Sequence, residues 1–345
     1  MTTRGWARRL APLAALLATA CETTPPSPTG SPRPPSSPPS SPSAVLGRND
    51  DAVVVIIQPG ETPASLARRY LGDERKAWRV TSLEPNHAWR PGAAAVVAMR
   101  AVDPGGTLGQ QAQRAPILCY HRFTNGRPSR METPAATFER QLQYLHDNGF
   151  TIVPLRDLTA FLAGQGELPP KAVVITIDDG YRSTYEIAYP LLKRFNAPAT
   201  VFVYSDFLGA PDALSTAQIR EMAQSGLVEI QSHTKTHADL RWRKPGRPST
   251  DYLKRTQQEL AIPRERLAPL AGASPDALAY PYGAADPQVL ELTAKGGYAL
   301  GLTLVRGGNA GWTEPLLLHR DMVFGTDSLD QFARRVAPAS QGFTR

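Results

Sequence analysis

The chain has 345 residues, of which 33 are proline, and it carries a formal net charge of +7. This length allows one large domain together with smaller units, and the excess proline is local. Two cysteines are too few for a disulfide scaffold or a zinc–thiolate site. The positive charge favours acidic polymers and anionic lipid head groups as partners, but no motif indicates binding to nucleic acid.

Residues 1–21 have the pattern of an export signal, with a basic start, an apolar stretch at Leu10–Leu17 and small residues before Cys21. The apolar stretch is too short to span a membrane. The position of Cys21 resembles the processing site of bacterial lipoproteins. This predicts that Cys21 is lipidated and anchors the protein in the bacterial cell envelope, facing the periplasm, with the lipid as the contact to the membrane. Cleavage after Ala20 by ordinary signal peptidase is the alternative, and it would give a soluble periplasmic or secreted protein.

Residues 22–50 are rich in proline and serine, with threonine, glycine and alanine making up much of the rest. Such a segment cannot bury enough apolar surface to offset the entropy lost on ordering. We therefore predict a disordered, extended linker that holds the following domains away from a membrane.

A small domain is predicted at residues 51–101. Val53–Ile57 has the pattern of a strand, and Thr62–Pro63 is typical of a helix start. A second helical stretch at Trp78–Leu83 and a last strand at Ala95–Val97 complete a βααβ order.

This order resembles a LysM domain, on the basis of residues Ile57–Thr62, Ala67–Tyr70, Asn86 and Arg90–Gly92. The resemblance implies binding to glycans that contain N-acetylglucosamine, such as peptidoglycan. The alternative is that a small domain of this shape only packs against the rest of the protein.

After a linker at residues 102–115, the pattern becomes that of alternating strands and helices. Val173–Ile177 is apolar throughout except for one threonine, as in a parallel strand that is covered on both faces. The helix predicted at Thr184–Phe195, bent near Pro190, leads to a strand at Ala199–Tyr204, which implies a right-handed parallel crossover. Further strands are predicted at Ile152–Val153, Leu278–Tyr280 and Ala299–Thr303. The region is therefore expected to have an α/β fold.

Two adjacent carboxylates, Asp178 and Asp179, follow the strand at Val173–Ile177. Side chains at the carboxyl ends of parallel strands face the crevice where such folds carry out their chemistry. Because successive strand residues point to opposite sides, the two carboxylates have different roles unless the chain has already turned. Gly180 permits that turn.

His233 and His237 follow a short strand at Val228–Gln231 and fall on the same rim as the carboxylates. Histidines four residues apart can share one face of a helical turn and so reach one ion. Two histidines, one carboxylate and a water form a common ligand set of catalytic zinc, although another divalent transition ion fits equally. The second carboxylate, Asp178, is then placed as general base for a metal-activated water. The pattern predicts a metal-assisted hydrolase.

Residues 116–345 resemble a polysaccharide deacetylase domain of the NodB-homology type, carbohydrate esterase family four. Thr176–Gly180 is similar to the first motif of that family, Ser232–His237 to the second and Ala279–Gly283 to the third. The resemblance implies a distorted, incomplete (β/α) TIM-like barrel with a surface groove. It also implies the following roles: Asp178 is the base, Asp179, His233 and His237 bind the metal, Tyr280, Pro281 and Tyr282 line the groove, and the Tyr282 amide helps to hold the oxyanion.

The chain departs from this family at the position of Ala279, where many members have an arginine that pairs with the catalytic base. Two histidines are candidates for the general acid. His121, in the segment Pro116–Phe123, resembles the start of the branch that includes exported poly-N-acetylglucosamine deacetylases, while His319 resembles the late histidine of the other branch. We favour His121, because the missing arginine points to the same branch.

The predicted function is metal-dependent removal of N-acetyl groups from a cell-envelope polysaccharide containing N-acetylglucosamine, with zinc as the first choice of metal. The acetylated glycan substrate is either peptidoglycan or exported poly-N-acetylglucosamine, and the sequence favours neither. Two other functions also remain open. One is an O-acetyl esterase, and the other is a glycan-binding protein without catalysis, which the missing arginine would explain.

Overall fold

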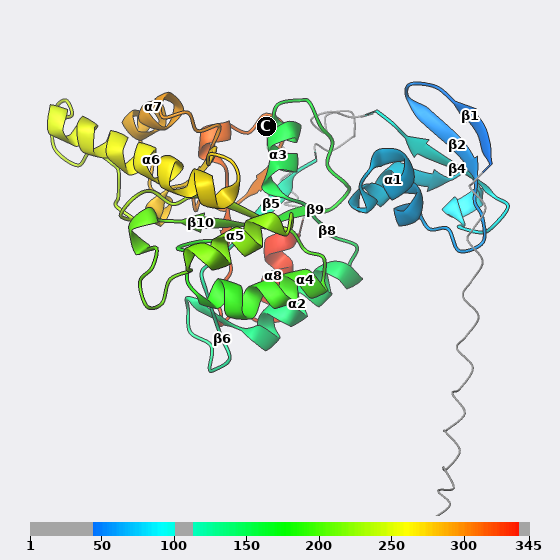
Figure 1. Cartoon of the computed structure of the whole chain (residues 1–345), viewed down its shortest axis with the longest axis horizontal. Helices are drawn as coiled ribbons and strands as arrows, with labels where there is room; N and C mark the ends of the chain where they lie inside the picture. Colours follow the sequence, from blue (N-terminus) through cyan, green and yellow to red (C-terminus); the bar gives the residue numbers. More distant parts are fainter. Residues whose placement is uncertain (1–43, 101–112, 338–345) are drawn as a thin grey trace, which may run out of the picture. The chain divides into compact units, whose positions relative to one another are not determined.

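The computed structural model describes residues 44–100 and 113–337 (Figure 1). The predicted signal segment with Cys21, residues 22–43 of the predicted first linker and most of the second linker lie outside the described residues. Within the described ranges, no helix is both long enough and apolar enough to cross a bilayer.

The N-terminal domain is a four-stranded antiparallel sheet in the order β1-β2-β4-β3, with one α-helix. Helix α1 begins with a capping box formed by Thr62 and Ser65 and ends at Gly72, which has a left-handed backbone with φ of 72°. In chain order the elements are β1 (Val45–Arg48), β2 (Ala52–Ile56), α1 (Pro63–Leu71), the 3₁₀ helix η1 (Glu74–Arg79), β3 (Val80–Ser82), the 3₁₀ helix η2 (Pro85–His87) and β4 (Ala94–Ala98).

Two predictions for this region were wrong in detail. Residues 45–48 form a strand on β2, although we placed them in a disordered linker. The predicted second helix at Trp78–Leu83 ends early, and Val80–Ser82 instead pairs with β4. Val80 and Ser82 are buried and Thr81 is exposed, so the alternation of a strand, and not local helix preference, decides the conformation.

The C-terminal domain has 22 elements between residues 115 and 336. They are β5 (Ala115–Tyr120), β6 (Arg122–Thr124), β7 (Glu132–Pro134), α2 (Ala135–Asp147), β8 (Thr151–Ile152), α3 (Leu155–Leu162), β9 (Ala172–Ile177), η3 (Thr184–Ala188), α4 (Tyr189–Arg194), β10 (Ala199–Val203), η4 (Ser205–Phe207), α5 (Thr216–Gln224), β11 (Val228–Ser232), α6 (Thr250–Ala271), β12 (Ala277–Ala279), η5 (Pro281–Gly283), α7 (Pro287–Lys295), β13 (Leu300–Leu302), β14 (Gly308–Asn309), η6 (Pro315–Leu317), β15 (Asp321–Met322) and α8 (Leu329–Val336).

The main sheet is curled and has the order β13-β12-β11-β10-β9-β5-β14, with parallel pairing from β13 to β5. The segment 318–322 contacts strands on both sides of the gap that the curled sheet leaves open. Leu318 forms a parallel bridge with Leu302 of β13, and β15 pairs with β5. This mixed α/β arrangement is a curled half-barrel, which agrees with the predicted incomplete barrel at that level of detail.

The sheet buries a separate apolar cluster on each face. Val174, Phe202 and Leu302 belong to the inner cluster, which helix α3 helps to fill. Val173 and Ile175 belong to the outer cluster with residues of α2, α4, α5 and α8. Figure 1 shows α2, α4 and α8 together on one side of the sheet and α3 on the other. Strand β9 is buried along its whole length, as predicted for a strand covered on both faces.

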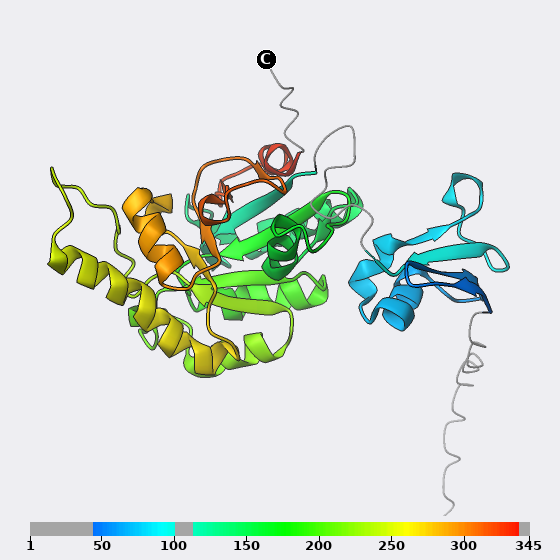
Figure 2. The same ribbon diagram turned by 90° about the horizontal axis from the view of Figure 1, so that it is seen from above.

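Helix α6 is the longest helix among the described residues and packs beside α5 and α7 (Figure 2). It also contacts β11, the strand that leads into the predicted histidine pair. The carboxyl ends of β5, β9, β11 and β12 thus carry the residues of the candidate site, and α6 lies beside one of them.

Candidate active site

Asp178 and Asp179 lie at the carboxyl end of β9, and the chain turns at Asp179 and Gly180. Asp178 continues the inward row of Val174 and Thr176, and it is 2% exposed. Asp179 already has a left-handed backbone with φ of 76°. At Gly180, with φ of 80°, a Cβ would meet Val203 at 3.0 Å, so glycine is required there. The turn starts one residue earlier than predicted, and it lets the two carboxylates approach the same site.

Arg320 holds Asp178 from the opposite side of the curled sheet. Its Nη1 and Nη2 donate to the two carboxylate oxygens of Asp178 at 2.7 and 2.8 Å, and its Nε donates to the carbonyl of Thr303 at 3.0 Å. The Arg320 side chain is fully buried. Burial alone would raise the pKa of Asp178, but the guanidinium of Arg320, together with the nearby His233, holds that pKa well below its ordinary value.

Sequence reasoning missed Arg320. The arginine expected at Ala279 is absent, and the segment 318–322 supplies one from another part of the chain. The sequence does contain a signal, because Arg320 stands two residues after Leu318 in an extended stretch and so shares the face of that buried leucine. The doubt that Ala279 raised about how Asp178 is held is thereby removed.

His233 and His237 are brought together by a loop and not by the predicted helical turn. His233 follows β11 directly, and its Nδ1–H donates to the carbonyl of Ala279 at 2.7 Å, which leaves Nε2 to face the carboxylates. Thr234 and His237 have left-handed backbones, with φ of 69° and 62°. The two imidazole rings lie 4.8 Å apart, edge to face.

Asp179, His233 and His237 have the geometry of a metal-ligand set. Oδ1 of Asp179 lies 3.5 Å from Nε2 of His233 and 3.4 Å from Nε2 of His237. Bonds of about 2.1 Å in a tetrahedral zinc site place neighbouring ligand atoms about 3.4 Å apart. Burial alone would lower the pKa of His233, but Asp178 and Asp179 raise it, so this position favours a positive charge. The three residues therefore fit a divalent cation.

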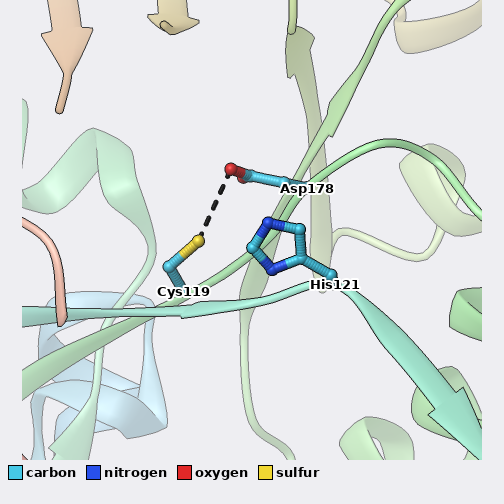
Figure 3. Close-up of side chains that lie close together, drawn as sticks. All are labelled: Cys119, His121 and Asp178. Atoms are coloured by element: carbon cyan, nitrogen blue, oxygen red, sulfur yellow. Dashed lines mark hydrogen bonds between the residues drawn. The ribbon is translucent and has the colours of Figure 1, made fainter. Parts of the chain in front are cut away.

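His121 and Cys119 lie close to the carboxylate of Asp178 (Figure 3). Both come from β5 or the residue after it, and the thiol of Cys119 donates to Oδ2 of Asp178 at 3.4 Å. Cys119 is fully buried, and burial raises the pKa of its thiol. Burial lowers the pKa of His121, while Asp178 and Asp179 act in the opposite direction. An imidazole thus stands next to the predicted base.

His319, the other candidate acid, lies against a different part of the chain. Its backbone bonds to the side chain of Asn309, and its ring packs on Gly307, where a Cβ would come 2.7 Å from Nδ1. Since Leu318 and Arg320 both face the inside of the sheet, His319 between them points the opposite way. The structure brings His121 to Asp178 and directs His319 away from it.

Of the three aromatic and proline residues predicted to line the groove, Tyr282 alone is exposed. Its ring is 67% exposed and meets His237 edge to face at 4.9 Å. Tyr280 is fully buried and donates its hydroxyl to the carbonyl of Leu316, and Pro281 is buried as well. The prediction was therefore wrong for the side chains of Tyr280 and Pro281, which belong to the packing beneath the site.

At the carboxyl ends of these strands, two histidines and one aspartate that fit a divalent cation stand next to a second aspartate, Asp178. The imidazole of His121 also lies close to that second aspartate. A cation held by the first set would activate water and polarise a carbonyl, while the second carboxylate could accept a proton and the imidazole could donate one. This fold and this arrangement of side chains are those of a hydrolase that acts on acyl groups.

Comparison with known proteins identifies the family. The family model described as polysaccharide deacetylase matches residues 165–301. YxkH of Bacillus subtilis (strain 168), which is named after the same family, is 30% identical over 211 residues, covering 61% of this chain and 72% of YxkH. This chain belongs to the polysaccharide deacetylase family and is a hydrolase of the polysaccharide N-deacetylase type.

Two further relatives support this family assignment. The poly-beta-1,6-N-acetyl-D-glucosamine N-deacetylase of Staphylococcus aureus (strain MRSA252) is 27% identical over 221 residues, which is 59% of this chain and 76% of that enzyme. The structure of the Streptococcus pyogenes deacetylase PplD in complex with acetate matches with a TM-score of 0.59 and 27% identity, over 66% of this chain and all of PplD. The chain spans only 36% of the Escherichia coli (strain K12) enzyme of the same name as the staphylococcal one.

Proposed function

We propose that this protein removes N-acetyl groups from a cell-envelope polysaccharide that contains N-acetylglucosamine, and that it does so with a bound divalent metal ion, zinc being the first choice. The observation that carries the proposal is the position of Asp178. It is fixed by Arg320 and lies beside the Asp179, His233 and His237 set, so a proton acceptor and a cation site share one space.

Asp178 acts as the general base. Its low pKa keeps it ionised at neutral pH, and Arg320 fixes the direction in which its oxygens point. When a zinc ion is bound by Asp179, His233 and His237, it supplies Lewis acidity toward the acetyl carbonyl and lowers the pKa of an attacking water. Asp178 accepts the proton of that water as the water attacks the carbonyl carbon.

The remaining steps use His121 and Tyr282. The backbone amide of Tyr282, in a left-handed turn with φ of 61°, donates to the oxygen on which negative charge develops. His121 donates a proton to the leaving nitrogen, and its nearness to Asp178 and Asp179 opposes the effect of burial on its pKa. Donation of this proton allows the amine to leave as the free amino group of the glycan.

The proposal includes two alternative substrates. The name of the staphylococcal relative supports exported poly-N-acetylglucosamine. The resemblance of residues 51–101 to a LysM domain supports peptidoglycan, with the domain holding the enzyme on its substrate. The antiparallel pairing of β2 and β4 around helix α1 supports this assignment of the N-terminal domain. We further propose that Cys21 is lipidated, so that the exported protein is anchored in the cell envelope and faces the periplasm.

The test is acetate release by the purified protein from N-acetylglucosamine oligomers and from peptidoglycan, each with zinc and with a chelator. Asp178→Asn is the matched variant, because it keeps the shape of the side chain and removes the charge. We expect release that needs zinc, and a loss of about 10²–10⁴-fold in Asp178→Asn. Full activity in the chelator would overturn the metal-dependent mechanism. Acetate release only from O-acetylated glycans would instead indicate an esterase. Retention of the protein on peptidoglycan without any acetate release would indicate a glycan-binding protein.

A further inference from the structure

The loop that carries the two histidine ligands has a backbone that L-residues adopt reluctantly. Thr234 and His237 have φ of 69° and 62°, and neither is a glycine or an asparagine. Such conformations persist when surrounding contacts hold them in place. The contacts of this loop therefore decide where His237 lies.

One side of the loop is held by the segment after β10. The amides of Ser205 and Asp206 donate to the carbonyls of Thr234 and Lys235, at 3.1 and 2.9 Å. Inside the loop, the amide of His237 donates to the hydroxyl of Thr234 at 3.0 Å. These bonds satisfy two loop carbonyls, but they leave the amides at the crest of the loop to be satisfied from elsewhere.

Glu259 of α6 satisfies them. Its Oε2 accepts from the amides of Lys235 and Thr236 at 3.0 and 2.8 Å, and its Oε1 accepts from the hydroxyl of Thr236 at 2.7 Å. A carboxylate that accepts three hydrogen bonds from two adjacent residues fixes the backbone between them. The bonds span 23 and 24 residues of sequence, so α6 acts as the support for the loop.

The three ligands do not depend on this support to the same extent. Asp179 is placed by β9, and His233 directly follows β11 and is fixed by its bond to the carbonyl of Ala279. His237 lies beyond the crest of the loop, and its side chain is 25% exposed, against 3% for His233. A change in the crest therefore displaces His237 more than the other two.

We infer that Glu259 is a positioning residue for the metal site, which holds the loop of residues 233–237 so that His237 completes the ligand set with Asp179 and His233. The inference rests on the proposed function, because it concerns the same cation site. Glu259 acts through the loop and touches neither the cation nor the substrate.

The experiment measures the dissociation constant of zinc by competition with a chromophoric chelator, using the full chain. We expect Glu259→Ala to weaken zinc binding by about 10–100-fold, the range found when residues that orient metal ligands are removed. Glu259→Gln keeps an oxygen for the two amides and is expected to restore most of the affinity. Glu265→Ala, the loss of an exposed acid on the same helix, is the matched control and is expected to bind zinc as the parent does.

The possible outcomes separate the inference from the proposed function. Parent protein that binds no zinc would overturn both. Tight binding in the parent and equally tight binding in Glu259→Ala would overturn the inference alone. Unfolding of the zinc-free proteins is followed in parallel. If Glu259→Ala and Glu259→Gln lose affinity equally, and both also unfold at lower temperature, the role of Glu259 is structural and the inference fails.

Discussion

In the proposed mechanism, each side of the site uses an aspartate, but for different chemistry. On one side, which we call the base side, Asp178 is buried and contacts Arg320 and Cys119. On the other, the ligand side, Asp179 faces His233 and His237. The guanidinium of Arg320 already balances the charge of Asp178, whereas the charge of Asp179 remains available for a cation. In the proposed mechanism, the position of one arginine thus distinguishes the base, Asp178, from the metal ligand, Asp179.

The two sides are also held in place by different means. The base side depends on a buried ion pair between residues far apart in the sequence, and the ligand side depends on backbone hydrogen bonds around a loop. Breaking a buried ion pair leaves a charge without its partner and costs stability. Loosening the loop leaves the core intact and affects the affinity for metal. Substitutions on the two sides should therefore differ in which measurement they change.

The largest effect is expected on the base side, at the proposed general acid, His121. His121→Ala should lower acetate release at saturating zinc by about 10²–10⁴-fold, because it removes the imidazole next to Asp178 that is proposed to protonate the leaving nitrogen. His319→Ala is the matched control. Its ring lies on Gly307 and points away from Asp178, so we expect turnover close to that of the parent. The measurement is kcat on an N-acetylglucosamine oligomer. The reverse ranking of the two variants would assign the acid to His319.

The second effect is a loss of stability. Arg320→Met should lower the free energy of unfolding by about 3–5 kcal/mol, because it leaves the carboxylate of Asp178 buried without its partner. Lys295→Met, which breaks an exposed pair with Glu291, should cost at most about 1 kcal/mol. Urea unfolding of chelator-treated protein measures both.

A double variant tests the cause of that loss. Adding Asp178→Asn to Arg320→Met removes the unpaired charge, so the double variant should be more stable than Arg320→Met alone. If the double variant is less stable than the single one, the loss comes from packing around Arg320 and not from the charge of Asp178.

How far the sequence predicts this site depends on whether each contact is local. Strand β9 and the two aspartates that follow it were predicted, because a buried parallel strand has a pattern within its own residues. The pairing of Asp178 with Arg320 was not, because the two residues lie 142 positions apart and no local pattern connects them. The same holds for Glu259, whose role depends on contacts with a loop 23 residues before it.

The histidine loop shows how a correct pairing can follow from an incorrect local structure. The spacing of His233 and His237 favours a helical turn, yet tertiary bonds from Ser205, Asp206 and Glu259 hold a loop instead. The third motif shows a similar limit. Sequence similarity marks Tyr280 and Tyr282 alike, but the turn after β12 buries the first and exposes the second.

The smallest effect is confined to acid pH, and it again separates the two sides. Arg320 lowers the pKa of Asp178 in the folded protein, although burial opposes this shift. An aspartate in the unfolded chain has a pKa of about 3.9. A carboxyl group whose pKa is lowered by folding stabilises the folded protein fully when the pH is above the pKa of that group in the unfolded chain. This stabilisation is lost as the pH falls below that pKa. Between about pH 5 and pH 3, the parent should therefore lose stability more steeply than the Asp178→Asn, Arg320→Met double variant, which lacks the titrating group. Urea midpoints of the two zinc-free proteins at each pH measure the difference. Parallel curves would mean that protonation of Asp178 does not contribute to acid unfolding, and that the base side is held by packing as much as by charge.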